Sequence, residues 1–438
     1  MQIKQIDESP LSALQMLVLA ICFVLNLLDG MDVMAISYSA PVITAEWSIT
    51  REALGIVFSA ALVGMTIGAV FISPLTDRIG RRKMIMISLA MIGVGMIATS
   101  FANSVISMGI LRLLTGLGIG SILASSTSMV SEYSPNRLRN FNITIYHSGY
   151  PIGAILTGLI ATLVLTDYGW RPLFIMAGVI SFGMLPVVYF LLPESLDFLV
   201  TSRRPGALEQ ANAILRRMRM AAFGELPPVE EKLITSTGVR AVLEGVRRLL
   251  EGRRKIPTMM LWAAFMMSFA TLYFLFSWVV ILARDSGLAI EDALYAGIAQ
   301  NLGAFVGTLI LGYLSNRFGL RRIIFIFFML AAVVIVPYGF VKTSVAIILI
   351  LIFLLMFFVQ GAFAGLYIVA ARLYPTEIRT TGIGWAIGFG RIGAIFGPSI
   401  AGFLLGAGLS ISWTFVVFAI PMVIAGLTII KLRATEIS

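Results

Sequence analysis

Twelve stretches of mostly apolar residues run through the chain, and no other feature of the sequence restricts its fold as strongly. Each is about 20 residues or longer, the length that a helix needs to cross the hydrocarbon layer of a membrane. Charged residues make up only 12% of the chain, whereas a soluble domain carries roughly a quarter. The sequence therefore predicts an all-α membrane protein with twelve transmembrane helices, near residues 13–40, 53–74, 84–103, 105–130, 139–166, 171–192, 257–284, 292–314, 322–341, 344–371, 380–406 and 412–431.

Lysine and arginine are concentrated in alternate loops. With a cytoplasmic N-terminus, the outward loops hold only Arg51, Arg171, Arg284 and Lys342. This positive-inside bias predicts a multi-pass protein of a bacterial-type cytoplasmic (inner) membrane with both termini in the cytoplasm. It also accounts for the net charge of +10 without a nucleic-acid partner. The polar N-terminal segment shows no removable signal peptide.

Two pairs of predicted cytoplasmic loops repeat at nearly the same distance. DRIGRRK (Asp77–Lys83) resembles NRFGLRR (Asn316–Arg322) at an offset of 239, and the loop at Pro135 resembles the loop at Pro375 at an offset of 240. Parallel repeats of this kind place a substrate site between two halves, near the midplane of the membrane. The predicted domains are two pseudo-symmetric six-helix bundles, 1–192 and 257–438, joined by a cytoplasmic linker with short amphipathic helices, 193–256.

Motifs along the whole chain resemble those of the major facilitator superfamily. SPLTDRIGRRK (Ser73–Lys83) is similar to the signature after the second helix, and GYLSNRFGLRR (Gly312–Arg322) to its degenerate copy. RLLTGLGIG (Arg112–Gly120) resembles the fourth-helix signature, and Pro193–Ser195 the end of the sixth helix. Ser73 stands where the family usually has glycine, which weakens the close helix packing expected there. The resemblance implies the major facilitator fold and a transporter, not an enzyme.

A closer resemblance lies in the first span. The stretch Leu27–Trp47 contains Asp29-Gly30-Met31-Asp32, which resembles the DGxD motif of the aromatic acid:proton symporter family. The stretch Tyr374–Pro398 is similar to the tenth-to-eleventh helix region of the same family. Motif matches are hypotheses, and this one implies uptake of an aromatic carboxylate together with protons.

Asp29 and Asp32 lie in the first span and Arg112 in the fourth. Ionisable groups inside a bilayer are costly and are functional candidates by default. The spacing of three residues puts both carboxylates on one face of a helix, and all three residues lie about 12–18 Å from the outer ends of their spans. We predict that they form the proton-coupling site. The alternative is a permanent ion pair that locks the two spans together.

Arg391 lies near the middle of the eleventh span, and no carboxylate is evident in the last six spans to neutralise it. A guanidinium binds a carboxylate through two hydrogen bonds, so we predict that Arg391 binds an anionic substrate. The alternative is an arginine that is satisfied by the backbone or that reaches the membrane surface. The resemblance also implies an arginine in this helix. Further candidates for the substrate site are His147, Tyr146, Tyr150, Tyr273, Trp278, Gln300 and Asn301. For His147 the alternative is a bond to a neighbouring helix, and for the aromatic residues of the seventh span it is a place in the core or against lipid.

Charged residues also gather at the predicted cytoplasmic turns. In the superfamily such charges form ion pairs between helices that hold the cytoplasmic side closed, and exposed pairs contribute only about 0–1 kcal/mol each. The alternative is a pure topology signal. The predicted cytoplasmic gate consists of Asp77, Arg78, Gly80, Arg81, Arg82, Glu132, Arg139, Glu377 and Arg379.

Together these patterns predict a proton-coupled symporter that imports a small aromatic carboxylate by alternating access. Its expected partners are this substrate, protons and the lipid bilayer. We expect a monomer with no metal, no cofactor besides the coupling proton, no catalytic residues and no nucleic acid. The alternatives are a carrier of other organic anions, dicarboxylates or muconate, a sugar carrier, and a drug exporter. The fifth span, GYPIGAILTGL (Gly149–Leu159), matches the antiporter motif GPxxGG poorly. A membrane enzyme or receptor lacks any supporting motif.

Overall fold

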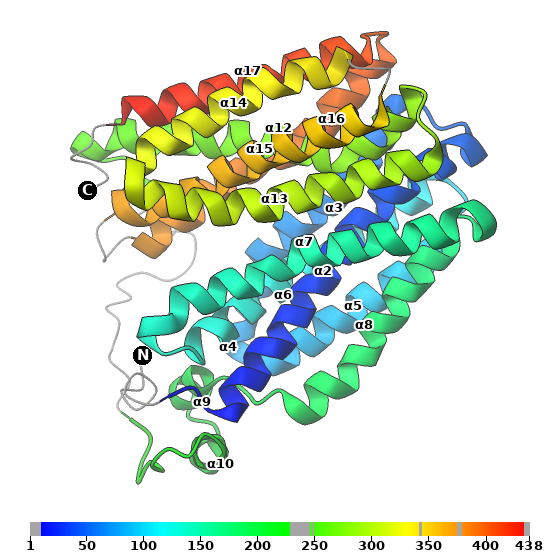
Figure 1. Cartoon of the computed structure of the whole chain (residues 1–438). Helices are drawn as coiled ribbons and strands as arrows, with labels where there is room; N and C mark the ends of the chain where they lie inside the picture. The colour runs from blue at the N-terminus through cyan, green and yellow to red at the C-terminus, as the bar shows by residue number, and fades with distance from the viewer. Residues whose placement is uncertain (1–9, 228–245, 248, 341–343, 375–378, 433–438) are drawn as a thin grey trace. The chain divides into compact units, whose positions relative to one another are not determined.

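Among the residues that the structure describes, twelve helices are long and apolar enough to cross a membrane, which confirms the predicted all-α architecture. The computed structural model describes residues 10–227, 246, 247, 249–340, 344–374 and 379–432 (Figure 1). The first six spans comprise α2 (Ala13–Trp47), α3 (Arg51–Ile67) with its extension to Ile79, α5 (Arg81–Ser100), α6 (Val105–Glu132), α7 (Asn136–Tyr168) and α8 (Arg171–Leu191). The last six are α12 (Lys255–Asp285), α13 (Ile290–Phe318), α14 (Leu320–Phe340), α15 (Val345–Leu373), α16 (Arg379–Gly406) and α17 (Ile411–Lys431).

The first span is longer than the sequence predicts. We expected it to end near residue 40, but α2 continues through Pro41 without a break to Trp47. Proline removes one backbone hydrogen bond from a helix, and transmembrane helices tolerate this because neighbouring groups satisfy the freed carbonyl. The seven additional residues include Glu46 and Trp47, which contact Trp170 between α7 and α8.

The second span changes its helical geometry near its predicted cytoplasmic end. α3 passes into a π-helical turn, η1 (Gly68–Ile72), a 3-10 turn, η2 (Ser73–Leu75), and a short α-helix, α4 (Thr76–Ile79). Pro74 lies in the 3-10 turn, and Gly80 then separates α4 from α5 with a positive φ of 103°. The backbone therefore bends at the DRIGRRK motif.

The linker contains the short helices that the sequence predicts. α9 (Leu196–Ser202) and α10 (Ala207–Arg217) follow α8 and pack on each other, and Figure 1 shows α9 near the start of α2. α10 is amphipathic, with Ala211, Ile214 and Leu215 buried and arginines in its last turn. The linker is thus partly packed onto the protein and is not only a tether.

Contacts group the chain into two compact units. Unit 1 comprises 1–33, 63–153 and 171–233, and unit 2 comprises 34–62, 154–170 and 234–438. In unit 1, α5 packs on α6 and α8; in unit 2, α12 packs on α16 and α17, and α13 on α15. The domain boundaries 1–192, 193–256 and 257–438 describe the sequence repeat and stay a prediction.

Candidate functional site

Asp32 and Arg112 contact each other inside unit 1. Nη1 of Arg112 lies 3.2 Å from Oδ1 of Asp32, and both side chains are almost fully buried. Nη2 of Arg112 donates to Oγ1 of Thr99 at 3.0 Å and to Oγ1 of Thr115 at 3.2 Å. The guanidinium also lies over the Phe174 ring, 5.1 Å from its centroid. Arg112 is therefore held from several sides and not by Asp32 alone.

The carboxylate of Asp32 is only partly satisfied. Its Oδ2 is buried and has no hydrogen-bond partner within the described residues, and the same holds for Nε of Arg112. An unpaired buried oxygen on a charged group is costly. Asp29 is also buried, at 4% exposure.

Glycines let α7 approach the DGxD segment closely. A methyl group on Gly30 would overlap the backbone carbonyl of Tyr150, and one on Gly153 would overlap the carbonyl of Leu27. The backbone N–H of Tyr150 donates to Oδ1 of Asn26 at 2.9 Å. Gly30 therefore serves the contact between α2 and α7, while the aspartates on either side of it carry the charge.

Three α7 candidates for the substrate site differ in accessibility. Tyr146 is buried and its hydroxyl pairs with Oγ of Ser126 at 2.9 Å, so it packs α7 on α6. His147 is exposed and its ring contacts the Tyr146 ring edge-on, with centroids 4.7 Å apart. Tyr150 is half-buried. His147 and Tyr150 therefore stay candidates for the substrate site, whereas Tyr146 packs between two helices.

Arg391 lies half-buried on α16, and among the described residues it forms no ion pair within 4.0 Å. Gly393 and Gly397 bring α16 against the backbone of α12, at Met266 and Ala270. The arginine interacts electrostatically with Tyr367 of α15, a residue that sequence reasoning missed because tyrosines at a membrane helix end are common anchors. Within the part of the chain that the structure describes, Arg391 is therefore a half-buried cation without a carboxylate partner.

Aromatic rings of α12 and α15 pack around the same part of unit 2. Phe269 contacts Phe363 at 4.6 Å and Tyr273 at 5.9 Å between ring centroids, and Phe265 contacts Tyr367 at 5.3 Å. Tyr273 is half-buried and remains a substrate candidate. Trp278 does not, because it is fully buried and its Nε1 donates to the Pro398 carbonyl at 3.0 Å.

Gln300 and Asn301 on α13 are fully buried polar residues. Nδ2 of Asn301 donates to the Gly297 carbonyl at 2.9 Å. Oδ1 of Asn301 and both amide atoms of Gln300 have no hydrogen-bond partner in the part of the chain that the structure describes. Buried polar groups in native proteins nearly always have partners, including water or ligands, so both amides stay candidates for the polar side of a substrate site.

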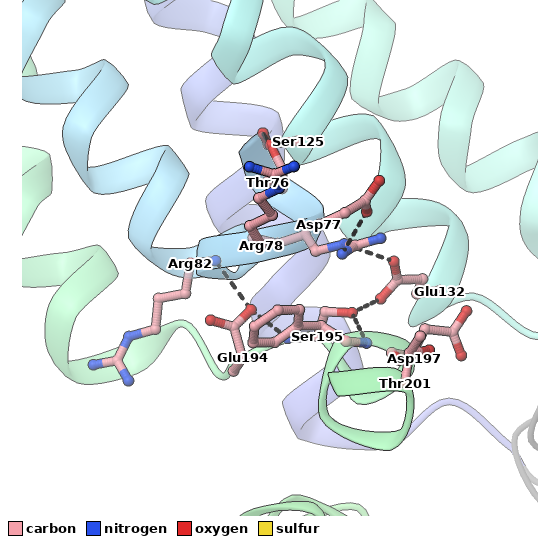
Figure 2. Close-up of polar contacts among 12 residues, drawn as sticks. Thr76, Asp77, Arg78, Arg82, Ser125, Glu132, Glu194, Ser195, Asp197 and Thr201 are labelled. Carbon is pink, nitrogen blue, oxygen red and sulfur yellow. Dashed lines mark hydrogen bonds and ion pairs between the residues drawn. The ribbon is translucent and has the colours of Figure 1, made fainter. Parts of the chain in front are cut away.

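The predicted gate residues of the first half form one cluster in unit 1 (Figure 2). Arg81 pairs with Asp77 at 2.9 Å and with Glu132 of α6 at 3.4 Å. Arg78 and Arg82 take part through their backbones, because Arg204 of the linker donates to the Arg78 carbonyl and the Arg82 N–H donates to Glu194 at 3.2 Å. Arg139 donates to the Ser131 carbonyl at 3.1 Å. Glu377 lies outside the described residues, as does the side chain of Arg379.

Glu194 and Ser195 complete this cluster, although the sequence pointed to them only as the end of the sixth helix. Ser195 Oγ donates to Glu132 and accepts the N–H of Phe198, which caps α9. Tyr133 donates to the Glu194 carbonyl at 2.7 Å, and its burial, followed by the charges of Glu132 and Glu194, holds the pKa of the Tyr133 hydroxyl well above its usual value. The linker is thus bonded to the motif after the second span (Figure 2).

Gly80 is the position in this cluster that a side chain would damage most. Its φ of 103° and ψ of 152° belong to a region used almost only by glycine, and a methyl group there would overlap the Glu194 carboxylate. We expect Gly80→Ala to lower the free energy of unfolding by about 2–4 kcal/mol, the backbone strain plus the overlap. The thermal unfolding midpoint of purified protein measures this.

Gly319 offers a matched control for that substitution. It occupies the corresponding place in the second-half motif, with a φ of 87° and no atom within 4 Å of an added methyl group. Gly319→Ala should therefore show the backbone strain alone, about 1–3 kcal/mol. Equal losses in the two variants would contradict a role for the Glu194 contact.

The fold and the buried charges define a helical membrane transporter, and comparison with known proteins identifies its family. The model of the Major Facilitator Superfamily matches residues 22–307 and 291–437. The chain belongs to this superfamily. It is 33% identical to a gallate transporter of Pseudomonas putida over 98% of this chain and 95% of the relative. It is 32% identical to the 4-hydroxybenzoate transporter PcaK of the same organism over 97% and 94%.

Other comparisons agree with this assignment. A benzoate transport protein of Acinetobacter baylyi is 28% identical over 97% of this chain and 91% of the relative. A partially occluded, inward-open structure of the xylose transporter XylE from E. coli superposes with a TM-score of 0.74 at 18% identity, covering 96% of this chain and 98% of that one. The latter shows the fold alone. The predicted resemblance to the aromatic acid:proton symporters is confirmed, and the chain is a transporter and not an enzyme.

Proposed function

We propose that this transporter is a proton-coupled symporter that imports a small aromatic carboxylate. The observation that carries the proton part is the buried Asp32–Arg112 pair, in which one carboxylate oxygen has no partner among the described residues. A carboxylate in a low-dielectric site favours its neutral form, and a nearby arginine favours the charged form. Two opposed influences of this kind make a group that can load and release a proton when its access changes.

The surroundings of Arg112 suit such a cycle. When Asp32 is charged, it pairs with Nη1; when it is protonated, Thr99 and Thr115 still accept from Nη2 and keep the guanidinium in place. The arginine therefore remains ready to stabilise the next deprotonation. Asp29, one helical turn away and also buried, provides a second carboxylate on the same face of α2.

The substrate part rests on Arg391. Its guanidinium forms no ion pair among the described residues and acts electrostatically on Tyr367, whose ring contacts those of Phe363 and Phe265. A carboxylate would pair with the guanidinium while the attached ring packs on the aromatic side chains. The unpaired amides of Gln300 and Asn301 would bind ring hydroxyl groups, and two relatives are transporters of hydroxylated aromatic acids by name.

The proposed function also includes the membrane, the orientation, the coupling ion and the cytoplasmic gate of the transporter. The positive-inside bias supports a bacterial inner membrane with both termini in the cytoplasm. The proton is the coupling ion, the chain acts as a monomer, and the linker cluster closes the cytoplasmic side when the transporter faces outward. Exposed charge pairs are individually weak, so the cluster can reopen in each cycle.

A ligand screen tests the proposed cargo. Purified protein is heated with benzoate, 4-hydroxybenzoate, gallate, muconate or xylose, each as a separate sample. A ligand at about 100 times its dissociation constant stabilises the folded state by about 2.7 kcal/mol, so aromatic acids should raise the unfolding midpoint. The methyl ester of 4-hydroxybenzoate is the matched control without the charge. Equal stabilisation by acid and ester, or stabilisation by xylose alone, would refute the proposal.

A further inference from the structure

One hydrogen bond in unit 2 joins two residues that occupy equivalent positions in the sequence repeat. Oγ of Ser37 on α2 donates to the backbone carbonyl of Ser277 on α12 at 3.2 Å, and the two residues are separated by 240 positions. This is the offset of the repeat found in the loops. Ser37 and Ser277 are therefore equivalent residues of the two halves, and equivalent residues that touch must lie at the pseudo-two-fold axis.

The residues that follow these two serines are both large aromatics. Tyr38 and Trp278 are again 240 positions apart, and both are fully buried. Most polar aromatic side chains in a membrane protein lie at the membrane surface, so two buried ones at equivalent positions need a structural reason.

Tyr38 lies in a slot between two glycines. A methyl group on Gly158 of α7 would lie 2.7 Å from the Tyr38 hydroxyl, and one on Gly297 of α13 would overlap Cε1 of the ring. α7 belongs to the same half of the repeat as Tyr38, whereas α13 belongs to the other half. The ring therefore separates a helix of its own half from a helix of the opposite half.

Trp278 repeats this arrangement in the other half. Its Nε1 donates to the carbonyl of Pro398 on α16 at 3.0 Å, and its ring contacts Phe58 of α3 edge-on at 5.5 Å between centroids. Pro398 is 240 positions from Gly158, and Phe58 is 240 positions from Ile298, which also lies against Gly158. Each ring thus has one neighbour from its own half, at equivalent positions, and one from the opposite half, where Gly297 and Phe58 are one position away from equivalence.

We propose that Tyr38 and Trp278 are a pair of aromatic wedges that close the Trp47 end of the transport path and lose their opposite-half neighbours whenever that end opens. Alternating access moves one half against the other around the substrate site. In that motion Tyr38 stays with Gly158 and Trp278 stays with Pro398, while the contacts with Gly297 and Phe58 break. The proposal requires alternating access only, and is independent of the cargo and of the proton.

The two buried rings stabilise the closed end more than the ion pair of Arg51 and Asp285 at the same end does. Arg51 and Asp285 form an ion pair of 2.6 Å between the two halves, but their side chains are 29% and 27% exposed. Partly exposed pairs are screened and contribute little. The wedges are fully buried, and emptying a buried slot leaves a cavity that the surrounding backbone fills only in part.

Cysteine labelling measures the closure directly. The single native cysteine, Cys22, is replaced by serine, and Ser277→Cys reports access at the axis because Ser277 is buried in the closed state and bonds through its backbone. We expect Tyr38→Ala and Trp278→Ala to raise the rate of maleimide labelling roughly ten-fold. The rate follows the population of molecules in which this end is open, and a small shift in a two-state equilibrium changes that population ten-fold. Tyr295→Ala, an exposed tyrosine on α13, is the control and should leave the rate unchanged.

Two further variants separate a wedge from other roles of Tyr38. Tyr38→Phe keeps the ring and should label like the parent. Gly297→Ala should speed labelling as Tyr38→Ala does, yet add nothing in the Tyr38→Ala background, because the methyl group then fills an empty slot. Three results would each overturn the proposal. The first is parent-like labelling in both Tyr38→Ala and Trp278→Ala, and the second is an effect of Tyr38→Phe as large as that of Tyr38→Ala. The third is an effect of Gly297→Ala that adds to that of Tyr38→Ala.

Discussion

Asp32→Asn is expected to abolish substrate accumulation driven by a pH gradient while leaving the protein folded. Asparagine has the shape of aspartate, and its amide oxygen can still accept a hydrogen bond from Nη1 of Arg112. In the native protein this nitrogen lies 3.2 Å from Oδ1 of Asp32. It cannot bind or release a proton, so the coupling is lost although the helix contact survives. Proteoliposomes with an acidic exterior measure the loss, which should exceed about ten-fold, as expected when a group acts in the coupling step itself.

Exchange without a gradient provides the internal control for this variant. Counterflow of labelled against unlabelled substrate needs binding and alternating access but no net proton movement, so it should persist in Asp32→Asn. Asp167→Asn, an exposed carboxylate near the end of α7, should behave like the parent in both assays. Undiminished uphill uptake by Asp32→Asn would rule out Asp32 as the coupling group.

Arg391→Ala is expected to weaken substrate binding about ten- to hundred-fold, which corresponds to the loss of about 1.5–3 kcal/mol from hydrogen bonds to a charged group. Arg391→Lys keeps the charge but not the planar fork, so it should recover only part of the affinity. Equilibrium binding of labelled substrate to purified protein measures both. The thermal shift produced by the acid should fall in parallel.

The exposed Arg322 at the start of α14 gives the matched control for lost charge. Arg322→Ala removes the same side chain far along the sequence from the candidate site and should bind substrate as the parent does. An Arg391→Ala protein with unchanged affinity would mean that the arginine serves helix packing, the alternative that the sequence left open.

The structure sorts the predicted site residues by their surroundings. Asp32 and Arg112 meet as the depth argument predicted, because two charges in lipid have few other partners. Tyr146 and Trp278 were expected to face substrate but are buried with satisfied polar atoms. A transmembrane helix is apolar on every side, so hydrophobic periodicity does not tell which face meets another helix and which meets a ligand.

The sequence predicted only some of the residues in the cytoplasmic gate. The sequence marked the charges of the DRIGRRK motif and Glu132, and these do form one cluster. It did not mark Glu194 and Ser195 as partners. Glu194 contacts Arg82, which is 112 positions away, and Ser195 contacts Glu132, which is 63 positions away. Such contacts depend on how the linker folds back, which has no local signal.

The sequence by itself determined the twelve spans, the two-fold repeat and the family, because lipid demands about 20 apolar residues per helix and a duplicated chain keeps its offset. Only the tertiary structure decided which residues touch: Asp32 with Arg112, Glu132 with Ser195, and Tyr38 within its slot of two glycines. The physical reason is that packing between membrane helices depends on shape and small residues, and not on a contrast between apolar and polar faces.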